Sequence, residues 1–320
     1  MLIGTWNLEN LYRPGGAFGP KDKVAYERKL ASLAAMLRAL DPVLLGVQEV
    51  GEPAALDDLL GLLDGTWHAT LSQHPDARGI RVGFLSRTPL AVLADEPAFP
   101  APLRPVQTDD STTDVARLSR GALSVSLLTR AIALDATVCH LKSKLLSYPG
   151  GRFQPHDEGE RARFGAYALF RRAAEATAVR GLADRMLHGD GREHSCVVLG
   201  DLNDEAAAAT TQILLGPPGS ELGTPGFDHP DKGDLARLWN VAELIPPGRR
   251  FSRVYSGRRE LIDHVLVSKR LLGQVTEAGT GAPDAPLAPE LPSVTDDPQE
   301  RRNAPASDHA PVWIKVRTPV

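Results

Sequence analysis

The sequence predicts an α+β protein with mixed β-sheets, and two observations lead to this prediction. Apolar runs typical of strands recur along the 320 residues, but helical patterns separate only some of them. In addition, the strand-like runs at residues 120–128 and 130–140 follow each other directly, which indicates hairpins. A strict alternation of strand and helix would favour a doubly wound parallel fold, so the observed order favours α+β layering.

The first half of the chain supplies one helix and several strands. LIGTWNL is typical of a first strand, and the next segment, VAYERKLASLAAMLRAL, carries leucines at helical spacing. Asp41-Pro42 ends this helix, because the residue before a proline disfavours the helical conformation. Val43–Val47 then forms a buried strand, and GIRVGFLSR and LSVSLLT alternate or run apolar as strands do.

The second half adds a long helix and the remaining strands. AIALDATVCHLKSK is a strand that ends in basic residues, and RARFGAYALFRRAAEATAVRGLADRMLHG is a helix closed by Gly189. SCVVLGDLND, LIDHVLVSKRLL and HAPVWIKVRT follow as further strand-containing segments. Residues 91–118 and 278–306 are rich in Pro, Ala and Asp, and we predict long surface loops there within a single domain of residues 1–320.

Composition and charge exclude several classes of protein. The net charge of −4 creates no global attraction to nucleic acid or anionic lipid, so any phosphate binding must come from local basic groups. The N-terminus lacks a basic and apolar leader, which predicts a cytoplasmic protein if Met1 is the true start. No apolar run approaches the ~18 residues of a membrane span. Cys139 and Cys196 lie in apolar runs and are predicted to be reduced core thiols rather than disulfide or zinc ligands.

Polar side chains stand at the ends of six predicted strands. These residues are Asn7, Glu49, His140, Asp201 with Asn203, Asp263, and Asp308 with His309. Because a sheet fold can gather strand ends at one mouth, we expect the side chains to meet. Carboxylate and amide oxygens suit a hard cation such as Mg²⁺, Mn²⁺ or Ca²⁺. Histidines beside the cation can donate to phosphate oxygens or move protons, so the set indicates hydrolysis of a phosphoester.

Each of these residues also has an ordinary structural explanation. Asn7 could form a turn, Glu49 could be a solvated strand end, and the pair Asp201 and Asn203 could form an Asx turn. The ordered set outweighs these explanations for the strand-end residues. By contrast, His264 alternates away from Asp263 and is predicted to be a packed or surface histidine. Solvated acids are predicted at Asp190, Asp204 and Glu205.

The strand-end motifs resemble those of a known family. TWNLEN, QEV, GDLND, LIDHVLV and SDHAPV are similar to the successive motifs of the endonuclease/exonuclease/phosphatase family, in the family's order from residue 4 to 314. The resemblance implies a DNase I-like, four-layer α/β/β/α sandwich with two stacked mixed sheets. It also implies that Glu49 is the main metal carboxylate, with Asn7 and Asp308 near the same ion.

The same resemblance implies roles for the remaining strand-end residues. Asp201 would orient or deprotonate the attacking water, and Asn203 would hold a phosphate oxygen. His309 would contact the phosphate while Asp263 fixes its tautomer, although in some members this histidine is the general base, and the sequence leaves both open. His140 resembles the histidine that protonates the leaving oxygen in the DNase-like branch. The acidic partner of that histidine is missing from Gly79–Arg87, so His140 either acts as this acid or only binds phosphate.

Local basic groups indicate the class of substrate. Lys142 and Lys144 follow His140 at alternate positions, and Arg78 is a weaker candidate for substrate contact. The segment GRRFSRVYSGRREL, which contains Tyr255 and Arg258, combines basic and aromatic residues in a way that suits a nucleic-acid backbone. IDHVLVS and HLKSK also resemble nuclease-type members of the family more than phosphatase-type ones. This resemblance implies a divalent-metal-dependent nuclease acting on DNA or RNA.

Two other functions compete with this prediction. One is a phosphatase or phosphodiesterase on a small or lipid-linked phosphate, such as an inositol phosphate or sphingomyelin. The phosphatase branch's Trp-Cys-Asp-Arg-like stretch is missing, because ELIDHVL stands in its place. The other is a catalytically dead scaffold, and the complete motif set argues against it. No protein partner can be inferred from the sequence.

Overall fold

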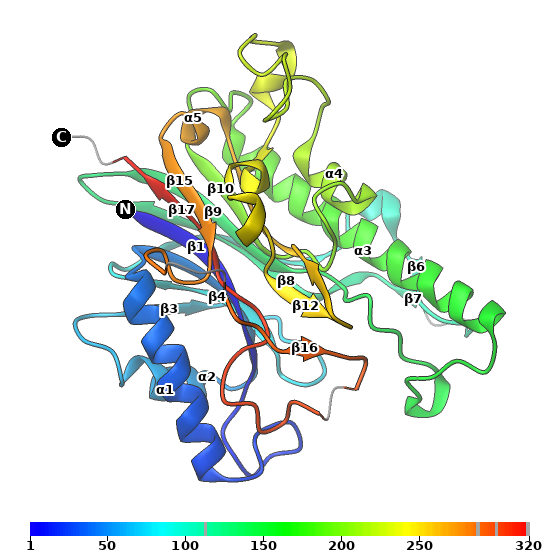
Figure 1. The fold of residues 1–320 in the computed structure, drawn as a ribbon. Coiled ribbons are helices and arrows are strands. Elements are labelled where there is room, and N and C mark those ends of the chain that lie inside the picture. The colour runs from blue at the N-terminus through cyan, green and yellow to red at the C-terminus, as the bar shows by residue number, and fades with distance from the viewer. Residues whose placement is uncertain (112–113, 286–288, 298–299, 318–320) are drawn as a thin grey trace.

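Two six-stranded β-sheets form the centre of the molecule in the computed structural model, which describes residues 1–111, 114–285, 289–297 and 300–317 (Figure 1). In spatial order, the first sheet contains β15 (Val275–Thr280), β17 (Val312–Val316), β1 (Leu2–Leu11), β2 (Leu44–Val50), β4 (Arg81–Ser86) and β3 (His68–Leu71). The second contains β11 (Trp239–Asn240), β14 (Asp263–Val267), β10 (Cys196–Asp201), β9 (Ala133–His140), β8 (Arg117–Leu128) and β5 (Ala91–Ala98).

Both sheets are mixed, as the sequence predicts. β1 pairs with β2 in parallel, and β9 pairs with β10 in parallel, whereas their other neighbours run antiparallel. Each parallel pair brings two strand ends to the same edge of its sheet. The carboxyl ends of β1 and β2 in one sheet, and of β9 and β10 in the other, carry residues of the predicted site.

Helices cover the outer face of each sheet, which gives four layers (Figure 1). α1 (Lys23–Leu40) and α2 (Pro53–Leu60) pack on the first sheet, where Leu33 contributes to one buried cluster with Val47. α3 (Glu158–Leu187) and α4 (Ala209–Leu215) pack on the second, where Leu182 shares a cluster with Val198. The apolar residues between the sheets form a third cluster, so the predicted α/β/β/α sandwich is confirmed.

Shorter helices, strands and 3₁₀ turns lie outside the two main sheets and the four main helices. They are α5 (Lys269–Leu272), the strands β6 (Val106–Gln107), β7 (Asp114–Val115), β12 (Arg253–Tyr255), β13 (Arg258–Glu260) and β16 (Ser293–Val294), and the 3₁₀ turns η1 (Ala101–Leu103), η2 (Pro149–Gly151), η3 (Lys232–Leu235), η4 (Val241–Leu244) and η5 (Pro247–Arg249). Among the described residues, no helix combines the length and the apolar character that a membrane crossing requires.

Capping residues set the ends of the two long helices. The side chain of Asp22 accepts a hydrogen bond from the backbone of Ala25 and starts α1, and the side chain of Asp157 does the same for α3. The α3 helix therefore begins at Glu158, three residues earlier than the sequence pattern predicts. Its left-handed C-terminal turn comprises His188 and the predicted terminator Gly189.

The prediction of one long surface loop at residues 91–118 was wrong, because this segment contains β5 and the start of β8. β5 is an edge strand whose one partner among the described strands is β8, and Val92 and Leu93 are 56% and 50% exposed. Its acids and Pro97 suit a strand edge but are also typical of loops. The second predicted loop, 278–306, is strand at residues 278–280 and 293–294. Residues 112–113, 286–288 and 298–299 of these two segments lie outside the described residues.

Both cysteines are buried free thiols, as predicted. Burial raises the pKa of the Cys196 thiol to about 12 and raises that of Cys139 as well. Both thiols are therefore protonated and apolar at neutral pH.

Candidate active site

Strand alternation delivers the predicted polar residues to one end of the space between the sheets. Side chains two apart on a strand share a face, so a row of inward-facing apolar residues can end in an inward-facing polar one. These rows run from Ile3 to Asn7, from Val138 to His140, from Leu199 to Asp201 and from Val265 to Asp263. All four of these polar side chains are buried, so the site closes one end of the inter-sheet core.

The register of the second sheet places Asp201 between two other site residues. Asp201 lies opposite Asp263 in the antiparallel pair of β10 and β14, and opposite His140 in the parallel pair of β10 and β9. The preceding Gly200 has φ +147°, and a Cβ there would lie 2.0 Å from the carbonyl oxygen of Cys139. Glycine is therefore required for the close approach of β9 and β10 beside Asp201.

Asp201 is the centre of the hydrogen-bonded cluster. The side-chain amide of Asn7 donates to its Oδ2 at 3.0 Å, and the backbone of Asn203 donates to its Oδ1 at 2.9 Å. The Nε2 atoms of His140 and His309 lie 3.4 and 4.0 Å from Oδ2. Burial, followed by the charge of Asp263, raises the pKa of Asp201 to about 7. Its carboxylate is thus suited to exchange a proton near neutral pH.

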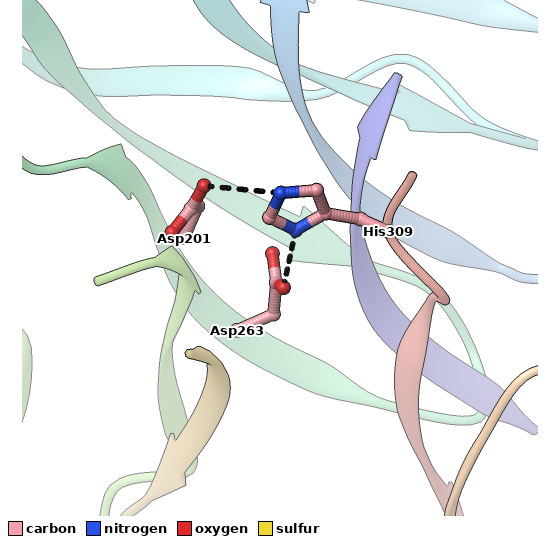
Figure 2. A group of neighbouring side chains, drawn as sticks. All are labelled: Asp201, Asp263 and His309. Atoms are coloured by element: carbon pink, nitrogen blue, oxygen red, sulfur yellow. Dashed lines mark hydrogen bonds and ion pairs between the residues drawn. The ribbon is translucent and has the colours of Figure 1, made fainter. Parts of the chain in front are cut away.

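The imidazole of His309 lies between two carboxylates, as Figure 2 shows. Its Nδ1 is 2.6 Å from Oδ2 of the fully buried Asp263, while its Nε2 faces Asp201. Burial disfavours the charged ring, but the carboxylates of Asp263, Asp308 and Asp201 outweigh it and raise the pKa of His309 to about 10. The ring is therefore protonated at neutral pH and presents an N–H toward Asp201.

Glu49 reaches the site through a local distortion of β2. In a regular strand Glu49 would share the helix-facing row of Val47. Its backbone is instead left-handed, with φ 60°, and the pairing with β4 shifts between Val47 and Val50. Its carboxylate accepts from the backbone of Asn10 at 2.8 Å and from the Asn7 amide at 3.3 Å. The bulge therefore aims Glu49 at Asn7.

A buried charge network connects Asp308 to β1, and sequence reasoning missed its central residue, Glu9. The Glu9 carboxylate accepts from Nη2 of Arg301 at 2.8 Å and from the backbone of Asp308 at 3.1 Å, and Nζ of Lys29 lies 4.0 Å away. Burial and then the charge of Asp308 raise the pKa of Glu9 to about 7. The backbone of Glu9 is left-handed, with φ 51°, and the pairing of β1 with β2 shifts between Asn7 and Leu11, so strand alternation gave no signal for Glu9.

Two arginines act electrostatically on His140, and only one of them, Arg78, was predicted from the sequence. Burial, and then the charge of Arg120, hold the pKa of His140 well below its usual value, and Arg78 adds to this effect. The imidazole is therefore neutral at neutral pH. Its Nδ1 is buried and has no hydrogen-bond partner within the described ranges. Arg120 stands near the start of β8, where an isolated arginine carries no sequence signal.

Four predicted substrate-binding residues form no hydrogen bond or ion pair with the Asp201 cluster in the part of the chain that the structure describes. Nζ of Lys142 donates to the backbone carbonyls of Ser143 and Leu145, both at 3.0 Å. Nζ of Lys144 lies 3.1 Å from Oδ1 of Asp204. The hydroxyl of Tyr255 donates to Asp296 at 2.8 Å, and Arg258 is exposed on β13.

The predicted arginine-rich segment separates into structural and site-facing members. Arg249 donates to the backbone carbonyls of Thr280 and Ala282, and Arg250 pairs with Glu243, so both stabilise loops. Arg253 instead has its Nε 3.8 Å from Oδ2 of Asp308, and its guanidinium lies 5.4 Å from the ring centroid of Tyr255. This basic and aromatic pair borders the site.

Two of the residues near the site serve the core. His264 is buried, with Nδ1 3.0 Å from the Asn240 amide, so of the two predicted alternatives, packed or surface, it is the packed one. Asp204 is also buried, so its prediction as a solvated acid was wrong. It accepts a hydrogen bond from Thr210 at 2.7 Å and pairs with Arg172 of α3, a partner that sequence spacing does not indicate. Asn203 donates its side-chain amide to the carbonyl of Leu141 at 3.0 Å.

The donor set fits a hard divalent cation. The buried or partly buried oxygens of Glu49, Asp201, Asp263 and Asp308 concentrate negative charge, and Oδ1 of Asp263 has no hydrogen-bond partner among the described residues. Donor atoms of Asp201, Asp263 and His309 lie within 4.8 Å of one another and could themselves hold an ion. However, a protonated His309 that is hydrogen-bonded to Asp263 has no lone pair for a metal, so the oxygens of Glu49, Asn7 and Asp308 are the better donors.

Known proteins show the same architecture. The family model described as Endonuclease/Exonuclease/phosphatase family matches residues 4–309. No curated protein sequence matches the chain. Similar solved structures include a mannosyl-6-phosphatase from Bacteroides thetaiotaomicron, with 15% identity and a TM-score of 0.55, and a 3'-5' exonuclease from Neisseria meningitidis, with 19% identity and a TM-score of 0.52. An endonuclease/exonuclease/phosphatase family protein from Leptotrichia buccalis shares 12% identity at a TM-score of 0.51.

Each of these three similarities covers 99% of both chains. At these identities the structures show a shared fold, and the family model covers nearly the whole sequence. The chain therefore belongs to the endonuclease/exonuclease/phosphatase family, whose members are phosphoester hydrolases with a DNase I-like fold.

Proposed function

We propose that the protein is a divalent-metal-dependent phosphodiesterase that cleaves DNA or RNA. The observation that carries this proposal is the position of Asp201 between a protonated His309 and a neutral His140, beside Asn7 and Glu49. This arrangement provides a proton acceptor, a charged donor and oxygen ligands at one end of the inter-sheet space. These are the groups that hydrolytic attack on a phosphoester requires.

Asp201 is the proposed acceptor of the proton from the attacking water. Its pKa of about 7 lets the carboxylate hold a proton reversibly at neutral pH. His309 donates from Nε2 to a phosphate oxygen and stabilises the negative charge that develops there. Asp263 holds the His309 ring through Nδ1, which fixes the direction of the Nε2 proton.

The remaining residues bind and orient the substrate. Glu49, with Asn7 and Asp308, would hold the divalent cation, which would neutralise phosphate charge and polarise the phosphoester. His140 is neutral and has an unpartnered Nδ1 within the described ranges, which favours phosphate binding over the alternative role of general acid. The side-chain oxygen of Asn203 and its second amide hydrogen have no hydrogen bond among the described residues, so both could contact the phosphate.

A nucleic-acid substrate is supported by the groups that border the site. Arg253 lies beside Asp308 and stacks against Tyr255, so a cation and an aromatic face are adjacent. Backbone phosphates and bases are recognised by this combination. Several arginines near the site thus provide the local positive charge that the acidic chain lacks overall.

A substrate panel tests the proposal. Purified protein is incubated with plasmid, linear duplex, single-stranded DNA, RNA, a generic phosphodiester, an inositol phosphate and sphingomyelin, each with Mg²⁺, Mn²⁺, Ca²⁺ or EDTA. We expect degradation of at least one nucleic acid with a divalent cation, and none in EDTA. His309→Ala protein, prepared identically, identifies activity from contaminating nucleases. Hydrolysis of the small or lipid-linked phosphates alone would replace the proposal with the phosphatase alternative.

A further inference from the structure

Two arginines from different sheets converge on a single carboxylate next to His140. Nη2 of Arg120, at the start of β8, lies 3.3 Å from Oδ2 of Asp76, and Nη2 of Arg78, just before β4, lies 3.5 Å from the same oxygen. The other oxygen of Asp76 accepts backbone hydrogen bonds from Arg78 and Ile80 at 2.8 and 3.0 Å. One carboxylate therefore serves two guanidinium groups, and neither arginine has a second ion pair among the described residues.

Arg120 is held in place but leaves most of its donors unused. Its side chain is only 10% exposed, and within the described ranges its one contact with an acidic group is the ion pair with Asp76. Its Nε is buried without a hydrogen-bond partner among the described residues. A buried, unpartnered donor on a charged group is unfavourable unless something else accepts its hydrogen bonds. An anionic ligand would supply such acceptors.

The backbone fixes this pair of arginines beside the candidate active site. The amide of Gly121 donates to the carbonyl of His74 at 2.9 Å, which ties the loop carrying Arg78 to the strand carrying Arg120. β8 is also the partner of β9, whose last residue is His140. In the pairing of β8 with β9, Leu123 lies opposite Val138, so the start of β8, with Arg120, lies beside His140 at the end of β9. The hydroxyl of Tyr12, directly after β1, donates to the carbonyl of Arg78 at 2.9 Å, which holds Arg78 near the carboxyl end of β1.

The mouth thus has two electrostatically different halves. Glu49, Asp201 and Asp263 form an acidic half that needs a cation before it can bind phosphate. Arg120 and Arg78 form a basic half, and in the described part of the chain neither pairs with those three acids. His140 lies between the halves, because its Nε2 is 3.4 Å from Oδ2 of Asp201 and its strand, β9, pairs with β8, which carries Arg120. The acidic half, once it holds a cation, would bind the phosphate that is hydrolysed. The two arginines of the basic half are then left to bind a second phosphate.

We propose that Arg120 and Arg78 form a subsite for a second phosphate group of the substrate, next to the phosphate that is hydrolysed. This rests on the proposed function and narrows it. The substrate is a chain of successive phosphodiesters, in which a neighbouring phosphate adds binding energy, rather than an isolated phosphomonoester. Arg78 is 38% exposed and marks the open side of the subsite, whereas Arg120 forms its buried wall.

Dinucleotides with and without an additional terminal phosphate test the subsite. The ratio of kcat/KM for 5'- or 3'-phosphorylated dithymidine to kcat/KM for plain dithymidine monophosphate reports the second phosphate alone. We expect wild type to prefer one of the phosphorylated substrates, and Arg120→Gln to lower this ratio roughly 10- to 100-fold, as loss of a charged hydrogen bond does. Arg120→Lys keeps the charge and should lower the ratio less. Arg259→Gln is the matched control, since Arg259 stacks on Phe251.

Equilibrium binding separates failure of the subsite from failure of the proposed function. In EDTA, the affinities of the same dinucleotides are measured by calorimetry for wild type, Arg120→Gln and the exposed Arg78→Gln. We expect the terminal phosphate to tighten binding to wild type and to have a smaller effect in both variants, even if no dinucleotide is hydrolysed. The subsite would be overturned if wild type bound the dinucleotides with and without the terminal phosphate equally well. It would also be overturned if both folded variants kept the full preference for the terminal phosphate. Neither result bears on the proposed function, which the hydrolysis assay tests separately.

Discussion

His309 is buried, yet the acids around it keep its ring protonated, and Asp263 is its closest partner at 2.6 Å. If Asp263 acts by orienting this ring, the two residues form one unit and the effects of their mutations do not add. We expect His309→Ala to lower the single-turnover rate about 100- to 1000-fold, because it removes a donor to the transition state. Asp263→Asn should cost less, and the double mutant should be little worse than His309→Ala.

Single-turnover rates of the four proteins at saturating metal measure this coupling. Thermal melting of the same samples detects a variant that simply unfolds. If the two losses multiply, Asp263 only supports the strand end, and its positioning role must be withdrawn.

The raised pKa of His309 also predicts how stability depends on pH. The folded protein, with a His309 pKa of about 10, binds a proton that the unfolded chain releases above about 6.5. The stabilisation is therefore complete below pH 6.5 and is lost as pH rises toward 10, at about 1.4 kcal/mol per pH unit. We expect the difference in unfolding free energy between wild type and His309→Gln, measured in EDTA by urea denaturation, to shrink over this window. A constant difference from pH 6 to 10 would contradict a protonated His309.

The residues that sequence reasoning found and those that it missed differ in a physical way. Asp201 and Asp263 stand at the ends of apolar strands, so the pattern along the chain exposes them, whereas Asn7, predicted to follow the first strand, lies within β1 just before its pairing shifts. The role of Arg120 depends on Asp76, 44 positions earlier on another strand connection, and spacing along one strand cannot show such a partner. Asp204 looked solvated for the same reason, because its counter-charge, Arg172, comes from a distant helix.

At the scale of elements, the loop that carries Asp308 depends on its attachment to β1. Arg301 and Glu9 form this attachment within a largely buried network that also includes Lys29. Removing one partner leaves the Glu9 carboxylate poorly compensated. We therefore expect Arg301→Gln to lower the unfolding free energy by about 2 kcal/mol. We also expect it to raise the Mg²⁺ concentration needed for half-maximal activity, because Asp308 loses its fixed position.

Arg302→Gln is the control for this prediction. Arg302 sits in the same loop but donates to the carbonyl of Gly19 at 2.7 Å, away from Glu9. Its loss should affect stability without changing the Mg²⁺ requirement. If Arg301→Gln destabilises the protein and leaves the Mg²⁺ requirement unchanged, the network supports the fold alone.

Elements with one strong periodicity were predictable, and elements defined by pairing were not. α1 and α3 repeat apolar residues at helical spacing, and β10 is an unbroken apolar run. β5 has an exposed face, acids and a proline, so only its hydrogen bonds to β8 distinguish it from a loop. The bulge at Glu49 likewise depends on the shifted pairing of β2 with β4. Such features arise from contacts between distant segments.

At the scale of the whole molecule, the candidate metal ligands join separate parts of the chain. Asn7 and Glu49 come from β1 and β2 of the first sheet, Asp308 precedes β17, and Asn7 already bonds to Asp201 of the second sheet. A cation bound only by the folded protein stabilises it by mass action, by about 2.7 kcal/mol at a concentration 100 times its Kd. Mg²⁺ or Mn²⁺ should therefore raise the melting temperature of the entire domain.

Glu49→Gln tests whether this stabilisation and catalysis depend on the same carboxylate. An amide keeps the shape of the side chain but removes the charge that attracts the cation. We expect the metal-free variant to melt close to metal-free wild type, to gain little from Mg²⁺ or Mn²⁺, and to lose hydrolytic activity. Glu27→Gln, which removes a surface carboxylate 3.3 Å from Lys23, should respond to the cation like wild type. A Glu49→Gln protein that keeps both the cation-dependent rise in melting temperature and its turnover would place the metal elsewhere, with Asp201, Asp263 and His309 as the next candidate ligands.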